Sequence, residues 1–380
     1  MLLDPKAPTP SKPHYLGVAL LAFALSSAVP AFAAGTTETQ QDRLDLHGDF
    51  RLRYEHNSSR GLEPSWSRGV LRGRLGATYR LNDRFEIGGR VVTGDPDNPR
   101  TTDITLSDFS SDFELSLDQA YATYRNGDLM LTAGKFAKPF ASTELVWDGD
   151  VNPQGIGGRY GFEFSDSLST QLSAVYFLID DNLATGDSSM RGAQLSATWN
   201  PAADWQLDLH VAYFDYELGP LLPNVAVLAR GNNVGPDNIS LLSDFDLFDI
   251  IGAISYSGFG DRWPVRFMGN FVRNHGAAVP EDTGYGFDLF VGHLEQSGHF
   301  QIQYGYMQAE KDAILGLFSH DNIVYPTNYK LHTLTINYKL MKRTFIGLTH
   351  YRFRRLDPDL ESLFGGGSGS RTRLNLFFSF

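Results

Sequence analysis

The sequence predicts an all-β fold, a 16-stranded antiparallel β-barrel that crosses a membrane. Three observations predict it: apolar and charged residues alternate with period two, short turns alternate with long loops, and the last strand ends in an aromatic residue. A strand with one apolar and one highly charged face does not suit a sandwich core, where its charges would be buried. It does suit a wall between lipid and a water-filled lumen.

The first predicted strand, residues 44–55, shows the alternation most clearly. One face carries Leu44, Leu46, Phe50, Leu52 and Tyr54, and the other carries Asp45, His47, Asp49, Arg51, Arg53 and Glu55. Residues 70–81 repeat the pattern and place Arg72, Arg74 and Arg80 opposite an apolar face. Asn82 and Asp83 then form a tight turn into a third strand that carries Arg84, Glu86 and Arg90 on its polar face.

The same rhythm continues to the C-terminus. Further strands are expected at residues 115–125, 129–136, 155–164, 168–179, 190–199, 205–217, 249–258, 263–274, 284–294, 299–309, 328–340, 343–354 and 371–380. Long loops are expected at residues 56–68, 94–114, 137–154, 180–189, 218–248, 275–283, 310–327 and 355–370. Several strands, notably 115–125 and 343–354, have ambiguous alternation, so counts of 14 and 18 stay open. An even count with short turns on one side and long loops on the other is typical of bacterial membrane barrels.

Both ends of the chain predict export to a membrane. Residues 1–33 read as a signal peptide, because a short apolar run at 16–25 lies between Lys12 and the small residues around Ala33. Residues 34–42 form a short segment, and 43–380 the barrel. The last strand, RTRLNLFFSF, alternates and ends in Phe378 and Phe380, which resembles the assembly signal of outer-membrane barrels.

Composition excludes several other classes of protein. The chain has no cysteine, so neither a disulfide-stapled domain nor a thiolate metal site is expected. Its formal net charge of −12 argues against nucleic acid as a partner. A soluble sandwich or propeller is disfavoured because no blade-length repeat recurs and one face of each strand is charged.

Arginines gather on the predicted inner face of the first three strands. These are Arg51, Arg53, Arg72, Arg74, Arg80 and Arg90, with Asp49, Glu55 and Glu86 among them. Neighbouring strands lie about 4.8 Å apart, so these side chains form a basic patch on one wall of the lumen. Cross-strand ion pairs without a further role are the alternative interpretation.

The loop at 137–154 is the most distinctive segment. Its Leu145, Val146 and Trp147 stand between acids, in a stretch that Pro139 and Pro153 keep out of a strand. An apolar anchor of this kind is expected to pack against the inner wall. The loop would then place Glu144, Asp148 and Asp150 inside the lumen.

The stretch LDQAYATY, LTAGKFAKPF and ELVWDGDVNPQG, within residues 117–155, resembles the bacterial putative porin family and, more faintly, phosphate-selective porins. The resemblance implies a Gram-negative outer-membrane barrel whose third loop folds inward against basic residues. It implies a pore constriction formed by Lys135, Lys138, Glu144, Asp148 and Asp150, opposite Arg51, Arg72, Arg74 and Arg90. With only two lysines beside three acids, a phosphate site is not expected.

The resemblance also implies a function and partners. Acids that face bases across a narrow aqueous pore favour small polar or charged solutes, which would diffuse passively through it. The expected partners are outer-membrane lipid and lipopolysaccharide, the barrel assembly machinery that reads the C-terminal strand, and two further copies in a homotrimer. The alternative function is that of an adhesin, a receptor or a structural barrel with an occluded lumen, since the loop at 218–247 is long and apolar enough to cap a pore.

Enzymatic function is not expected. The sequence has no GxSxG, no HExxH and no phosphate-cradling glycine loop, so no catalytic residue, cofactor or catalytic metal is predicted. The loop acids Asp95, Asp97, Asp108 and Asp112 leave open a cation site, with solvated surface as the simpler interpretation.

Overall fold

The computed structural model of the protein describes residues 43–60, 65–95, 98, 100–106, 114–180, 187–220, 229–357 and 368–380. All of them lie in one compact unit, 40–380. The predicted signal peptide (1–33) and the segment 34–42 lie outside the described residues. Within the described part of the chain, no helix is long and apolar enough to cross a membrane.

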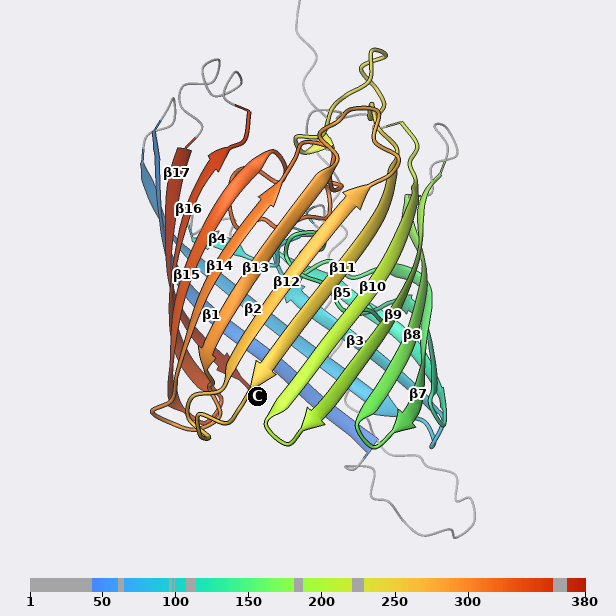
Figure 1. The fold of residues 1–380 in the computed structure, drawn as a ribbon, viewed down its shortest axis with the longest axis vertical. Helices are drawn as coiled ribbons and strands as arrows, with labels where there is room; N and C mark the ends of the chain where they lie inside the picture. Colours follow the sequence, from blue (N-terminus) through green and yellow to red (C-terminus); the bar gives the residue numbers. More distant parts are fainter. Residues whose placement is uncertain are drawn as a thin grey trace, which may run out of the picture. The chain divides into compact units, whose positions relative to one another are not determined.

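The described residues form a single antiparallel sheet that closes on itself (Figure 1). Its strands are β1 (Leu44–Arg60), β2 (Trp66–Arg80), β3 (Phe85–Thr93), β4 (Ile104–Leu106), β5 (Leu115–Asn126), β6 (Leu129–Lys135), β7 (Gln154–Ser165), β8 (Leu168–Asp180), β9 (Ser188–Ala202), β10 (Trp205–Glu217), β11 (Phe245–Tyr256), β12 (Val265–Asn274), β13 (Thr283–Gly292), β14 (Phe300–Ala309), β15 (Tyr329–Met341), β16 (Thr344–Arg355) and β17 (Ser368–Ser379). Closure comes from β1, which pairs with both β2 and β17.

The ring contains 16 strands, as predicted, because β4 is an addition to it. The sheet has 17 strands, but β3 pairs directly with β5, and β4 pairs only with Gly69, Val70 and Leu71 of β2. β3 accompanies β2 only as far as Arg74, so β4 takes over the part of β2 beyond it. The segment 94–114, expected to be a loop throughout, therefore contains one short strand.

The alternation of the sequence becomes two different faces of the wall. On β10, Phe214 points into the barrel and is fully buried, whereas Leu209 and Tyr213 point outward and are 49% and 45% exposed. Outward apolar side chains recur around the ring, since a wall in lipid need not bury them in protein.

Short turns join the strands at one end of the barrel, where the C-terminus also lies, and longer connections join them at the other (Figure 1). The predicted turn at Asn82 forms because its side-chain oxygen accepts hydrogen bonds from the backbone N–H of Arg84 (2.9 Å) and Phe85 (3.0 Å). Between β5 and β6 the chain turns at Gly127, whose φ of 57° suits a residue without a side chain.

Several strands begin earlier or end later than predicted. β9 spans Ser188–Ala202, and β11 starts at Phe245, four residues before the expected position. Phe245 and Leu247 pair with Tyr216 and Phe214 of β10, and all four point into the barrel. These four side chains pack against loop residues inside the lumen, and this burial favours the extra pairing of β10 with β11.

Candidate functional site

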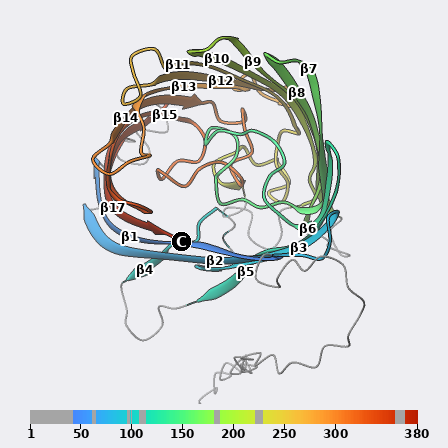
Figure 2. The same cartoon turned by 90° about the horizontal axis from the view of Figure 1, so that it is seen from below.

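Two loop segments lie inside the barrel. Figure 2 shows a green segment around residues 136–153 and an orange segment around 310–327 within the ring of strands. Leu145, Val146 and Trp147 of the first segment are 0%, 2% and 1% exposed, and Ile314 and Phe318 of the second are 0% and 3% exposed. Because each strand turns alternate side chains inward, these segments meet an apolar inner wall at β8, β10 and β11.

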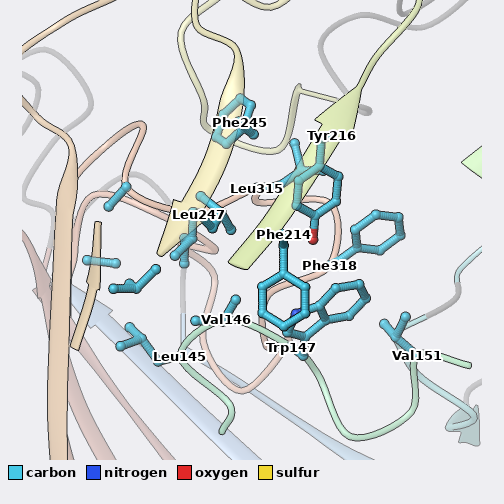
Figure 3. Close-up of a cluster of buried hydrophobic side chains, with 14 of the residues drawn as sticks. Leu145, Val146, Trp147, Val151, Phe214, Tyr216, Phe245, Leu247, Leu315 and Phe318 are labelled. Atoms are coloured by element: carbon cyan, nitrogen blue, oxygen red, sulfur yellow. The ribbon is translucent and has the colours of Figure 1, made fainter. Parts of the chain in front are cut away.

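Trp147 lies at the centre of this apolar cluster (Figure 3). Its ring stacks on Phe318 of the second segment, with centroids 5.4 Å apart and planes 8° apart. It meets Phe214 of β10 edge-on at 5.6 Å and stacks on Tyr216 at 6.3 Å. Aromatic pairs in this distance range contribute about 0.5–1.5 kcal/mol each beyond the area that they bury. The cluster therefore holds both loops against the wall.

Hydrogen bonds also join the two loop segments directly. The backbone N–H of Asp148 donates to the carbonyl of Phe318 (2.7 Å), and the N–H of Asp321 donates to the Asp148 carboxyl (3.2 Å). The amide of Asn322 donates to Glu144 Oε2 (3.3 Å). The loop at 137–153 is thus anchored to a second loop as well as to strands.

Burial changes the ionisation of groups in this loop pair. It raises the pKa of Glu144 to about 7, opposed by the charge of Lys138 and reinforced by that of Asp321. Burial also raises the pKa of Asp148, and the nearby carboxylates of Glu144 and Asp321 add to the effect. Burial lowers the pKa of Lys138, against the attraction of the acids around it. Near neutral pH the Glu144 carboxyl is therefore only partly ionised.

The predicted arginines gather on the inner wall, where they form ion pairs with aspartates. Arg51 and Arg53 both bind the carboxylate of Asp103, with 2.8 Å between Arg53 Nη1 and Asp103 Oδ2. Burial alone would raise the pKa of Asp103, but the charges of the two arginines lower it. Arg72 and Arg74 both bind Asp49, at 2.8 and 2.6 Å. The carboxylates hold neighbouring guanidinium groups side by side, which would otherwise repel each other.

Arg74 forms a second ion pair, and Arg90 is also paired with an acid. Arg74 contacts Asp150 of the loop (Nη1 to Oδ1, 3.1 Å), and Thr102 donates to the same carboxylate at 3.5 Å. Arg90 contacts Asp118 of β5 at 2.5 Å. Asp150 thus links the loop to the arginine wall.

The other predicted constriction residues lie elsewhere. Glu144 and Asp148 contact the 310–327 segment rather than an arginine of the wall. Lys138 donates to the carbonyl of Asp148 within its own loop (2.5 Å). Lys135, the last residue of β6, lines a cavity together with Asp150.

Sequence reasoning missed part of the basic wall. Arg373 of β17 donates to Glu55 of β1 (2.6 Å) and to Asn322 (2.7 Å). Arg371 donates to the backbone carbonyls of Asp321 (3.1 Å) and Asn322 (2.8 Å). A signal was available, since both arginines lie opposite the apolar face of the last strand, next to the first strand once the barrel closes.

Cavities remain between the loops and the wall. One of about 430 Å³ is bordered by Glu144, Asn270, Asp288, Gln303 and Tyr351, and no basic side chain of the described residues lines it. Another of about 550 Å³ lies between the 150–154 stretch and β3, β5 and β8, and includes Asp118 and Lys135. Spaces of this size and polarity can hold water and small polar molecules.

The C-terminal aromatics close the barrel. Phe378 lies opposite Phe50, with ring centroids 6.3 Å apart, and the backbone of Phe380 exchanges hydrogen bonds with Gly48 at 3.1 and 3.3 Å.

The candidate cation site falls largely outside the part of the chain that the structure describes. Of the candidate loop acids, Asp97, Asp108 and Asp112 lie outside the described residues. Among those that the structure describes, no group of three or more acids and histidines is arranged to hold a metal ion.

Comparison with known families agrees with this geometry. The model of the putative porin family matches residues 63–219, which confirms the resemblance inferred from the sequence. No curated protein matches the chain.

Solved structures share the fold. OprB of Pseudomonas putida has a TM-score of 0.58 at 13% identity, over 90% of this chain and 95% of that one. A loop-deletion mutant of OmpT, an outer membrane protein of Vibrio cholerae, has 0.54 at 12%, over 89% and 99%. The outer membrane channel DcaP of Acinetobacter baumannii has 0.50 at 14%, over 89% and 97%. The chain is similar to these proteins in architecture.

Proposed function

We propose that this chain is an outer-membrane porin, a passive channel for small polar or charged solutes. The observation that carries the proposal is a closed ring of 16 strands with apolar residues outside and an ion-paired, polar wall inside. Sixteen strands enclose more space than side chains alone can fill. A channel, rather than an enzyme, is the activity that this geometry supports.

The constriction is formed by two loops acting together. The segment 137–153 carries Asp150 to the arginine wall, and 310–327 fixes it from the opposite side. Solutes would pass beside this loop pair, through the cavities that it leaves. Of the five residues, Lys138, Glu144 and Asp148 act by shaping the loop and its charge, and Asp150 binds a predicted arginine. Lys135, at the end of β6, lines the cavity beside Asp150.

The remaining features of the proposal concern export and assembly. Residues 1–33 would act as a signal peptide, 34–42 as a short N-terminal segment, and Phe378 and Phe380 as part of the signal that the assembly machinery reads. The structure of OmpT from Vibrio cholerae in its trimer form shares this architecture, which supports a homotrimer here. The loops would face outward and the short turns the periplasm.

A second function has one observation in its favour. The apolar cluster around Trp147 fills part of the lumen on the loop side, as an occluded adhesin or receptor would require. The two functions differ in the wild type, because an occluded barrel carries no current while its loops are in place.

The test is conductance in planar lipid bilayers with residues 144–150 replaced by a short glycine linker. We expect larger conductance steps, because the apolar anchor and Asp150 are lost together. A matched control variant shortens the exposed residues 236–239 of the β10–β11 connection, and it should leave the conductance steps unchanged. Conductance steps of equal size in the two variants would show that residues 144–150 do not narrow the channel.

A further inference from the structure

The outer face of the barrel changes character toward the loop end of β16. Its outward residues, in order from the short-turn end, are Ile346, Leu348, His350, Arg352 and Arg354. The last three are exposed, and they replace an apolar face by a basic one within the same strand.

The neighbouring strand changes at the same position. Arg352 lies opposite His332 of β15, and Arg354 lies opposite Lys330. Together Lys330, His332, His350, Arg352 and Arg354 form what we call the basic patch. On its other side β17 contributes hydroxyls, with His350 and Thr372 in a hydrogen bond of 2.9 Å.

Among the residues that the structure describes, no acid pairs with the permanent cations of the basic patch. Lys330, Arg352 and Arg354 form no ion pair within the described part of the chain. The outward positions of β14, β15, β16, β17 and β1 carry no aspartate or glutamate at all.

Two outward arginines elsewhere on the described wall differ in this respect. Arg191 of β9 lies 3.8 Å from Glu217 of β10, and Arg273 of β12 binds Asp282 of the β12–β13 connection at 3.0 Å. The basic patch is therefore a local feature rather than a property of the whole rim.

An unpaired basic side chain on a lipid-facing wall needs an anion nearby. Arg or Lys costs about 2–4 kcal/mol at the middle of the bilayer and about 0–1 kcal/mol near its surface. Arginine binds phosphate through two parallel hydrogen bonds, which suits a lipid headgroup. Two residues on one strand face lie roughly 7 Å apart, and adjacent strands roughly 5 Å, so the basic patch spans a headgroup with more than one phosphate.

We propose that the basic patch binds the phosphate groups of an anionic lipid in the leaflet on the loop side of the membrane. The inference goes beyond the channel proposed above and uses only its membrane location. A second copy of the chain is a poorer occupant, because the basic patch would repel itself and the outward acids of β10 and the β12–β13 connection already lie beside arginines.

The test measures lipid binding to the purified, delipidated full chain by native mass spectrometry. The probes are diphosphorylated lipid A, the same lipid with its phosphates removed, and inorganic phosphate as a competitor. The variants are Arg352→Gln/Arg354→Gln and, as a matched control, Arg191→Gln/Arg273→Gln. Heat-dependent gel mobility verifies folding, and bilayer conductance verifies the channel separately.

We expect Arg352→Gln/Arg354→Gln to weaken binding of the diphosphorylated lipid about tenfold or more, since two charge-assisted contacts are lost. The control variant should bind the diphosphorylated lipid as tightly as the wild type does. The dephosphorylated lipid should bind weakly to the wild type and to the control. Three results would each overturn the proposal. The two double variants could bind the diphosphorylated lipid equally, or millimolar inorganic phosphate could displace that lipid from the wild type. Alternatively, Arg352→Gln/Arg354→Gln could lose oligomers while it keeps the lipid. Absent conductance in the wild type would instead count against the channel.

Discussion

At the scale of single residues, the inner wall depends on acids that hold arginines together. The inward orientation of Arg51 and Arg53 could be predicted, because alternation along one strand fixes it. Their partner could not, since Asp103 reaches them from a connection whose path the sequence pattern does not specify. Asp150 and Arg74 were placed near each other only through the family resemblance.

Replacing Asp103 by asparagine tests the value of this pairing. Both arginines and the aspartate are about one-tenth exposed, so Asp103→Asn leaves buried cations unpaired. We expect a loss of about 3–5 kcal/mol in the free energy of unfolding. Denaturant titration in detergent micelles measures it. Asp282→Asn, which breaks the more exposed pair with Arg273, should cost about 0–1 kcal/mol.

The raised pKa of Glu144 predicts a pH dependence of loop docking. The docked carboxyl holds its proton up to about pH 7, against 4.5 for an ordinary glutamate. The docked loop therefore gains most stability below pH 4.5 and loses it as the pH rises through 7. We expect conductance to rise across this window.

The measurement is single-channel conductance from pH 4 to 8. Glu144→Gln, which imitates the protonated carboxyl, should flatten the rise, whereas the exposed Glu217→Gln should not. A wild-type channel with constant conductance over this range would contradict the prediction.

At the scale of elements, the strands could be predicted from the sequence, whereas the entry of the 310–327 segment into the lumen could not. A strand of the wall carries its own evidence, because its apolar residues recur at every second position. The residues of 310–327 that enter the lumen show no such period. Phe318 is buried by Trp147, which lies far away in the sequence, so its role appears only when the barrel is closed. β4 was missed because three residues are too few to show alternation.

The contact between the two loops can be measured by a double-mutant cycle. Trp147→Ala and Phe318→Ala each remove a buried ring from the same stack, and each should cost about 3–5 kcal/mol. The double variant should cost less than their sum by about 0.5–1.5 kcal/mol. Unfolding in micelles gives all three values, and Trp147→Phe serves as the conservative control. Strict additivity would show that the two loops dock independently.

At the scale of the whole molecule, a barrel with this wall needs lipid outside and water inside. Leu374 lies halfway along β17 and Leu340 near the end of β15, and both face outward. We expect Leu374→Lys to destabilise the barrel in lipid by about 2–4 kcal/mol, and Leu340→Lys by about 0–1 kcal/mol. Unfolding titrations in lipid vesicles compare the two. Equal costs would contradict the predicted position of the membrane.

If the protein is a porin, the closed wall surrounds an open aqueous path. The current through the purified wild-type chain in a planar bilayer under a small voltage tests this path. We expect stepwise increases of equal size, each proportional to voltage and to salt concentration. Protein that inserts in folded form and carries no current would contradict it.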